Sequence, residues 1–485
     1  MPEFHDLPRG LPGSPASSGS APRALWMDPK ILADSAFWQE APDKVRLGAL
    51  GDQLLAIKDN RHLMTIAGSR AGKGTSVIVP VLLTYTGSIC VLDPKGENAT
   101  LTCRRRGQGE GLPAGGLQQD VHVLDPFRVA EVPDHYRSSF NPFAGLDAQS
   151  STFVDDCDSI ADALVVASAR EAQDHWNNSA RMVLRGFIAW VAAHDQDLRE
   201  LQRLLHLPPE TEDGQDFYSV LEAMHEAPRV AAGVPAQTAA ALQGMSDKER
   251  DSVLSTVRQN IAFLGSPPMA ELLSGRGRSP DLHNWKRGAC TVYLCLPAGR
   301  LHRHARFFRL FITRLLAAVE SDPRETDPPA LLLLDEMAVL GHMEALETGA
   351  GLLAGFGVRI WSVLQDLNQL KHLYRDRWET FMGNSGILQF FGVNDQTTLK
   401  YVSDRLGQSS MLSLSQSEIS YDQAARGFSG KSTTIQTTPL LTPNEVGWAF
   451  SRQSGKQLIL YPGADPIFLD RVPYWTKPYA GMVPQ

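Results

Sequence analysis

A glycine-rich loop between two apolar segments constrains the fold of this chain more than any other feature. The loop comprises Gly68, Ser69, Arg70, Ala71, Gly72, Lys73, Gly74 and Thr75. The apolar residues 62–66 before it predict a buried strand, and residues 73–85 after it predict a helix. At such a junction backbone N–H groups converge on phosphate oxygens, and a lysine reaches the β and γ phosphates. The loop therefore predicts a nucleoside triphosphate site with Lys73 as its phosphate-binding lysine.

Two residues depart from the usual pattern G-x-x-x-x-G-K-[S/T]. Ala67 stands in place of the first glycine, and Gly74 stands where a hydroxyl normally binds Mg²⁺. Thr75 follows directly, so we take it as the candidate magnesium ligand of the loop, with a water molecule as the alternative. The competing interpretation of the loop is an ordinary strand–turn–helix connection whose glycines supply positive φ angles.

An acidic pair follows a continuous apolar run. Residues 330–334 predict a buried strand, and Asp335 and Glu336 come directly after it. In P-loop enzymes one such acid holds Mg²⁺ through water and the other polarises the attacking water, roles that we predict for Asp335 and Glu336 respectively. An acidic helix N-cap after a core strand is the alternative. The loop and the acids together favour an enzyme that uses ATP and Mg²⁺.

Polar residues also end two other predicted strands. Gln365 closes the strand pattern of residues 358–366, at the sheet edge where the loop is expected, and we predict that it senses the γ-phosphate or the lytic water. A surface glutamine is the alternative. The segment "VLDPKGEN" places four polar or glycine residues at another strand end, where they line either the nucleotide crevice, a subunit contact or an exposed turn: Asp93, Lys95, Gly96 and Glu97.

The order of the elements predicts an α/β fold with a doubly wound, mainly parallel sheet. Further strand patterns occupy residues 88–95, 121–127, 290–297, 386–393 and 456–463. We also expect a hairpin that turns at Asp59-Asn60 and whose second strand, 62–66, enters the glycine loop. Residues 151–285 lack strand patterns and predict an inserted all-α domain, so the nucleotide-binding domain takes residues 46–150 and 286–485. Residues 1–45, rich in Pro, Gly and Ser at their start, predict a disordered arm or cloning-derived sequence.

Composition argues against a broadly basic nucleic-acid-binding protein, a disulfide-rich protein and a membrane-spanning protein. The formal net charge is −8, so nucleic-acid contact requires a local patch or channel. The basic clusters 300–309 and 103–107 supply either such contacts or the solvent-exposed faces of helices. Five cysteines without a CxxC pair favour reduced thiols, and no apolar run approaches the ~18 residues of a membrane span.

The motifs as a set resemble the type IV secretion coupling proteins of the conjugative TraG/TraD kind. Besides the loop and the acidic strand, from about residue 50 to 470 they include "VLDPKGENATLT", "VHVLDPF" with "FNPF", "DHWNNSARMVLRGFI", "KERDSVLSTV", "VYLCLPAGRL", "WETFMGNSGILQFFGVNDQTTLKYVSDRLG" and "PLLTPNEV". Each is weak alone, but their order is specific. The family often has glycine after the P-loop lysine, so Gly74 is expected in it.

The resemblance implies a RecA-like P-loop domain with an inserted all-α domain, in a homohexameric ring with ATP at subunit interfaces. It implies that the all-α domain meets the relaxosome, DNA or effector proteins, and that the ring works with secretion channel components at the cytoplasmic face of the inner membrane. A ring also needs an arginine in trans, for which the candidates are Arg359, Arg375, Arg377 and Arg405. Family members usually begin with a membrane anchor. Here an arm rich in Pro, Ser and Gly precedes the first predicted hairpin, so we expect either that the anchor was removed or that this member is naturally soluble. In both cases we expect the chain itself to be soluble and cytoplasmic, and monomeric if the anchor is needed for assembly.

The predicted function is an ATPase that recruits substrate and powers its transfer in type IV secretion or conjugation. Two alternatives remain open. One is a soluble DNA translocase of the FtsK or HerA type, which would show DNA-stimulated turnover without a secretion partner. The other is an adaptor that docks protein cargo and hydrolyses ATP weakly, if at all, which Gly74 keeps open.

Overall fold

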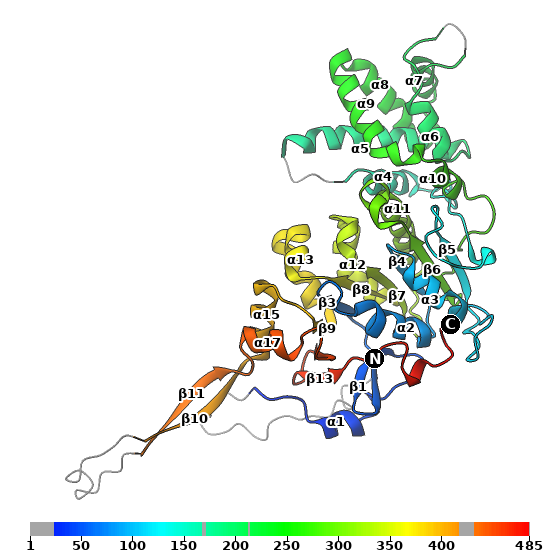
Figure 1. Cartoon of the computed structure of the whole chain (residues 1–485). Coiled ribbons are helices and arrows are strands. Elements are labelled where there is room, and N and C mark those ends of the chain that lie inside the picture. Colours follow the sequence, from blue (N-terminus) through cyan, green and yellow to red (C-terminus); the bar gives the residue numbers. More distant parts are fainter. Residues whose placement is uncertain (1–23, 167–170, 212–213, 417–430, 485) are drawn as a thin grey trace, which may run out of the picture.

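A computed structural model describes residues 24–166, 171–211, 214–416 and 431–484. Within these residues an eleven-stranded sheet forms the centre of the molecule (Figure 1), in the order β2-β1-β13-β12-β9-β3-β8-β7-β4-β6-β5. Neighbours from β9 to β5 are parallel, whereas those from β9 to β2 are antiparallel. The strands are β1 (Val45–Leu50), β2 (Gln53–Ile57), β3 (His62–Ala67), β4 (Ile89–Asp93), β5 (Asp120–Leu124), β6 (Cys290–Cys295), β7 (Ala330–Asp335), β8 (Val358–Leu364), β9 (Ser385–Phe391), β12 (Lys456–Leu460) and β13 (Ile467–Asp470).

Helices cover both faces of the sheet, as the doubly wound prediction requires. Successive leucines of β7 alternate between two cores, Leu331 and Leu333 in one and Leu332 and Leu334 in the other. The first core includes α1 (Pro29–Asp34), α2 (Val79–Thr84) and α3 (Glu97–Arg106). The second includes α11 (Leu301–Glu320), α12 (Glu344–Leu352), α13 (Leu367–Tyr374), α14 (Trp378–Gly383), α15 (Gln396–Leu406) and α17 (Pro443–Ala449).

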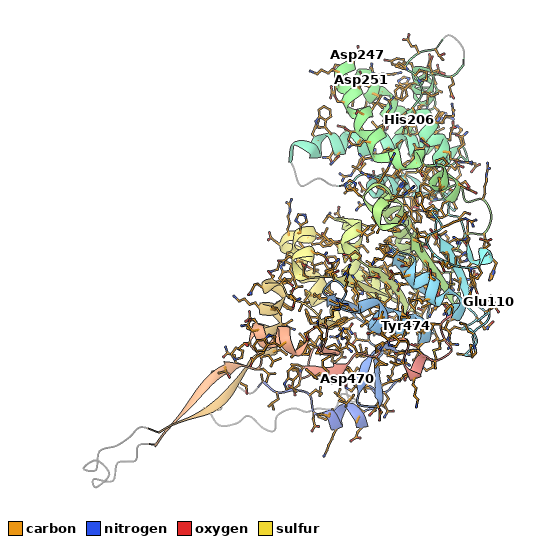
Figure 2. All side chains as sticks on the ribbon, in the orientation of Figure 1. Glu110, His206, Asp247, Asp251, Asp470 and Tyr474 are labelled. Atoms are coloured by element: carbon orange, nitrogen blue, oxygen red, sulfur yellow. The ribbon has the colours of Figure 1, made fainter. Side chains whose placement is uncertain are left out.

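Between β5 and β6 the described chain forms helices and no strand. They are α4 (Phe153–Leu164), α5 (Glu171–Ala193), α6 (Leu198–Leu205), α7 (Phe217–His225), α8 (Val234–Gly244), α9 (Asp247–Ile261) and α10 (Pro267–Leu272), called the helical region below. Its labelled residues His206, Asp247 and Asp251 lie at one end of the molecule, far from Asp470, the last residue of β13, and from Tyr474 (Figure 2). A separate all-α domain bounded at 151 and 285 remains a prediction.

The predicted hairpin is wrong in its partners. β2 pairs with β1 across the turn at Gly51-Asp52, where Gly51 has a φ of 60°. β3 does not pair with β2 but lies between β8 and β9, parallel to both. The polar Asp59-Asn60 step therefore carries the chain from the sheet edge to its centre, where the apolar residues of β3 are buried from both faces.

Two further segments complete the described fold. Residues 24–45, predicted as part of a disordered arm, contain α1 and the buried Leu32 and Trp38 instead, whereas residues 1–23 lie outside the described residues. β10 (Gln408–Gln416) and β11 (Lys431–Pro439) form an antiparallel ribbon that extends away from the body (Figure 1). All five cysteines are buried and unpaired, as predicted for reduced thiols.

Candidate nucleotide site

The glycine loop lies at the carboxyl end of β3, and the chain then enters a π-helical turn, Gly74–Ile78, before α2. Arg70 and Gly72 take positive φ angles of 57° and 93°, and the Ser76 N–H closes the turn on the Gly72 carbonyl at 2.9 Å. Positive φ angles turn successive N–H groups toward a common point, which makes a concave anion site. The loop therefore has the backbone shape that binds phosphate, at the edge of the sheet where ligands of α/β folds bind.

A second segment fixes this loop from outside. A Cβ on Gly68 would collide with the Gly392 carbonyl oxygen, and a Cβ on Gly392, whose φ is 61°, would collide with the Ala71 Cβ. Gly392 follows β9 and donates its N–H to the Phe450 carbonyl at 2.6 Å. Only glycine at both positions allows this backbone contact, so the end of β9 sets the position of the loop.

The lysine and the acids predicted from the sequence come together in space. Lys73 Nζ lies 3.1 Å from Glu336 Oε2 and 3.6 Å from Asp335 Oδ1. Lys73 and Glu336 are 263 positions apart in the sequence. β7 lies two strands from β3, with β8 between them, and all three end at the same edge. The carboxyl ends of parallel strands meet there, which explains the juxtaposition.

Gln365 joins the same cluster. It follows β8, and its Nε2 donates to both carboxylate oxygens of Glu336 at 3.0 and 3.1 Å. Gln369 adds a bond to Glu336 at 3.4 Å and accepts from the Gln365 N–H at 2.9 Å. Glu336 itself has φ 71° and ψ 57°, a left-handed conformation that costs a non-glycine residue about 1–2 kcal/mol. Its side-chain bonds hold it there.

Asp335 has a polar environment that the sequence did not reveal. Asn98 on α3 donates to Asp335 Oδ2 at 3.3 Å and to Asp93 Oδ1 at 3.4 Å. Burial raises the pKa of Asp335, an effect that Lys73 opposes, and burial together with the Asp335 charge raises the pKa of Asp93 to about 7. Asp93 caps α3 by accepting from the Ala99 N–H at 2.8 Å, so it supports Asn98 from behind the site.

These residues fit a magnesium–nucleotide complex. Asp335 Oδ1 is buried and makes no hydrogen bond, although it faces the Lys73 ammonium. Mg²⁺ could coordinate such an unpartnered carboxylate oxygen beside a phosphate-binding loop, or a water ligand of Mg²⁺ could donate a hydrogen bond to it. Thr75, the predicted magnesium ligand of the loop, donates its hydroxyl to the Gly72 carbonyl at 3.1 Å, which leaves the oxygen lone pairs available.

Comparison with known proteins identifies the family. The profile of the family described as Type IV secretory system Conjugative DNA transfer matches residues 22–482. The chain belongs to this family. It is 25% identical over 456 residues to the conjugal transfer protein TraG of Agrobacterium fabrum, covering 90% of this chain and 64% of TraG. It is 25% identical over 419 residues to the protein VirD4 of the same organism, covering 86% of this chain and 59% of VirD4. The chain thus spans about three fifths of these relatives.

Solved structures of a bacterial conjugative coupling protein, TrwB, share the fold. The trigonal form of TrwBdeltaN70 with sulphate superposes with a TM-score of 0.65 at 14% identity, covering 94% of this chain and 96% of that one. TrwB in complex with the ATP analogue ADPNP superposes with a TM-score of 0.63 at 14% identity, covering 96% of this chain and 98% of that one. This likeness covers nearly the whole of both chains and shows a common fold. Among the described residues, no helix combines the length and apolar character of a membrane span.

The arginines expected to act in trans in this family differ in accessibility. Arg359 is 3% exposed and donates to the Asp59 and Ala354 carbonyls at 3.0 and 2.9 Å, so as a trans donor it was predicted wrongly. Arg375, Arg377 and Arg405 are exposed, and Arg377 pairs with Glu347. Which of these three acts in trans remains a prediction.

The basic clusters do not form a continuous exposed surface. Arg106 is fully buried and donates to backbone carbonyls around Gly87, and Arg309 is 5% exposed. Arg306 donates to the Leu164 carbonyl and to Asn260 at 2.8 Å each. His302 and Arg303 are the exposed basic side chains in the middle of the 300–309 cluster. Arg106, Arg306 and Arg309 therefore stabilise the fold, a role that neither sequence interpretation included.

Arg471, which sequence reasoning missed, also contacts the loop. It donates to the Ala71 carbonyl and, at 2.8 Å, to the Arg452 carbonyl, and its guanidinium lies 4.7 Å from the Phe391 ring centroid. Three residues later the Tyr474 N–H donates to the Thr75 carbonyl at 2.9 Å. The segment after β13 thus braces the glycine loop, and no local pattern around residue 471 signals this.

Proposed function

We propose that this chain is the ATPase of a type IV secretion coupling complex, which hydrolyses ATP at the Lys73–Glu336 site and uses the energy to transfer substrate. The observation that carries the proposal is the convergence of Lys73, Asp335, Glu336 and Gln365 within hydrogen-bond or ion-pair distance. A phosphate-binding lysine, two carboxylates and an amide at one strand edge are the groups that ATP hydrolysis requires. Family membership supports the same function.

Each residue has a role in this proposal. Lys73 and the loop amides of residues 68–75 bind the phosphates, and Asp335, with Thr75 as the second candidate, holds the Mg²⁺. Bound Mg²⁺ would neutralise charge that develops on the phosphates. Glu336 accepts a proton from the attacking water, and Gln365 orients that water or binds the γ-phosphate. Asn98 and Gln369 orient the two acids through the bonds described above.

The proposal extends to assembly and cargo. TrwB has been described in complex with ADP and Mg²⁺, which agrees with ATP and Mg²⁺ as the cofactors here. We propose a homohexamer at the cytoplasmic face of the bacterial inner membrane, with nucleotide between subunits and an arginine from the neighbour completing the site. The helical region would recruit relaxosome, DNA or effector proteins and pass them to the secretion channel.

The test is ATP hydrolysis by the purified chain with Mg²⁺, with and without single- and double-stranded DNA. Lys73→Ala should lower turnover by a factor of about 10² or more, because the phosphates lose their main cationic partner. Lys400→Ala, an exposed lysine on α15, is the matched control. DNA-stimulated turnover without any secretion component would favour a soluble translocase instead. Nucleotide binding with no hydrolysis under all of these conditions would favour the cargo adaptor.

A further inference from the structure

Two arginines one turn apart on α11 bind the end of α4. Arg306 Nε donates to the Leu164 carbonyl at 2.8 Å, and Arg309 donates to the Ala163 carbonyl at 2.9 Å and the Asp162 carbonyl at 3.3 Å. The last carbonyls of a helix have no partner within the helix and carry partial negative charge. The two guanidinium groups supply both the missing donors and the opposite charge, so α4 is fixed to α11 at this end.

Arg309, unlike Arg306, also binds the segment that follows Glu336. Its Nη1 donates to the Leu340 carbonyl at 2.9 Å and to the His342 carbonyl at 2.6 Å. Residues 337–340 form the 3₁₀ turn that follows Glu336 directly. One buried guanidinium therefore joins the exit of the acidic strand β7 to the end of α4, and all its partners are backbone carbonyls.

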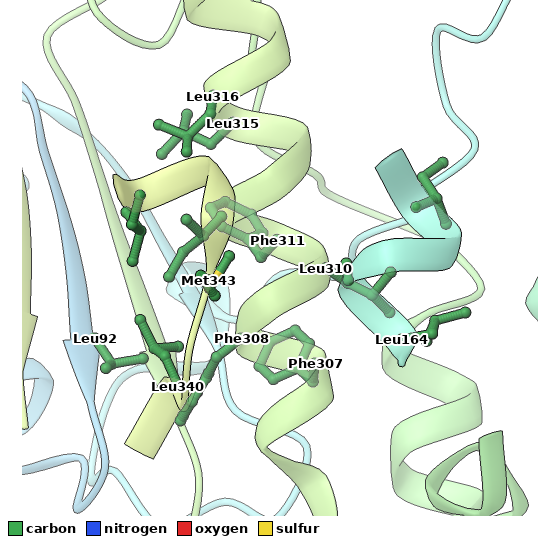
Figure 3. Packing of buried hydrophobic residues seen from close by; sticks show 14 of the residues in the cluster. Leu92, Leu164, Phe307, Phe308, Leu310, Phe311, Leu315, Leu316, Leu340 and Met343 are labelled. Carbon is green, nitrogen blue, oxygen red and sulfur yellow. The ribbon is translucent and has the colours of Figure 1, made fainter. Parts of the chain in front are cut away.

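Apolar packing follows the same path. Leu340 and Met343 lie beside Phe308 on one side of α11, and Leu310 points toward Leu164 on another side (Figure 3). All of them belong to one buried cluster that continues into the helical region. The segment after Glu336 and the end of α4 thus contact one helix through both side chains and hydrogen bonds, so neither moves without disturbing the other.

The opposite end of this segment is held at the candidate nucleotide site. The left-handed Glu336 is kept in place by side-chain bonds from Lys73 and Gln365. The proposed function assigns Lys73 to the phosphates and Gln365 to the attacking water or the γ-phosphate. As these side chains turn to the bound nucleotide and its water they release Glu336, and its strained backbone is then free to relax. Residues 337–340 would shift with it, and their carbonyls are the ones that Arg309 binds.

We infer that Arg309 is a positioning residue that couples Glu336 to α4 and, through α4, to the helical region. Arg309 follows its carbonyls because a buried guanidinium without partners is strongly unfavourable. α4 packs on α5, the 23-residue helix of the helical region, so a displacement of α4 reaches the surface that the proposed function assigns to cargo. The inference rests on the proposed function for the roles of Lys73 and Gln365.

The test is hydrogen exchange of the full chain with and without ADPNP and Mg²⁺, read in peptides that cover residues 153–165 and 337–343. Arg309→Lys keeps the charge but cannot span both carbonyl sets, since an ammonium is a compact point donor. Arg306→Lys is the matched control, because Arg306 binds Leu164 and Asn260 but no residue of 337–343. Analogue affinity is measured in parallel by fluorescence anisotropy.

In the wild type we expect the analogue to change exchange in both segments. In Arg309→Lys the change at 337–343 should persist while that at 153–165 falls by about half or more, and Arg306→Lys should keep both. An undiminished response of 153–165 in Arg309→Lys, or an equal loss in Arg306→Lys, would overturn the inference. So would a wild-type response confined to 337–343, which requires no variant. A wild-type chain that binds no analogue would contradict the proposed function and this inference together.

Discussion

Substitution of Gly392 by alanine tests whether the end of β9 positions the glycine loop. The new Cβ would lie within 3.0 Å of the Ala71 Cβ, whereas ordinary contacts begin at 3.4 Å, so the loop must retreat by more than 0.4 Å, the difference between those values. The φ of 61° adds about 1–2 kcal/mol of backbone strain. Because displacement by about 1 Å costs reactions about 10²-fold, we expect nucleotide affinity and turnover to fall by about 10- to 100-fold, or about 1.4–2.8 kcal/mol.

The assay is anisotropy of a fluorescent ATP analogue together with steady-state hydrolysis, and thermal unfolding reports stability. Gly383→Ala, at the end of α14 just before β9, is the matched control, because Gly383 is exposed, a Cβ there meets nothing within 4 Å and its φ is not positive. It should bind and hydrolyse nucleotide as wild type does, with a stability equal to or slightly above that of wild type. If Gly392→Ala folds and binds the analogue within about two-fold of wild type, the reasoning about close backbone approach is refuted.

Three further outcomes are expected. Burial lowers the pKa of His62 to about 4 from 6.5, so its contribution to stability is present above pH 6.5 and lost as the pH falls toward 4. Between pH 8 and pH 5, the free energy of unfolding measured in urea should therefore fall by about 2 kcal/mol more in wild type than in His62→Gln. Equal decreases in the two proteins would contradict this. Asn98→Ala should raise the Mg²⁺ concentration for half-maximal hydrolysis several-fold, because Asp335 loses an orienting bond, and an unchanged Mg²⁺ titration would remove Asn98 from the site. Arg471→Lys should weaken analogue binding by about ten-fold through the loss of the multiple bonds that brace Ala71, with wild-type affinity as the contrary result.

Local sequence pattern was sufficient for the elements that carry the chemistry. The strand before Gly68 leads into the glycine loop, and the strands before Asp335 and Gln365 lead into those polar residues. Parallel strands end at one edge, so the meeting of these residues was predictable. The left-handed conformation of Glu336 was not, because it depends on side-chain bonds to residues on other strands.

Contacts between distant segments account for what the sequence left hidden. β3 could not be assigned to β8 and β9 rather than β2, because an apolar strand pattern carries no information about its neighbours. Gly392 and Arg471 act on the loop from the end of β9 and from the segment after β13, with no local signal of that role. Arg359 and Arg309 were both expected to be accessible, yet each is buried against backbone carbonyls, since a charged residue in a sequence does not reveal its burial.

Single-turnover ATP hydrolysis by Glu336→Gln, measured alongside its equilibrium binding of ATP, tests most directly whether these residues form a catalytic site. Glutamine keeps the size and the hydrogen-bonding reach of the side chain but cannot accept a proton from water. We predict ATP binding at least as tight as in wild type, because a negative charge near the phosphates is removed, and a hydrolysis rate lower by a factor of about 10² to 10⁴. Wild-type hydrolysis by this variant would contradict the assignment of Lys73, Asp335, Glu336 and Gln365 to one catalytic site.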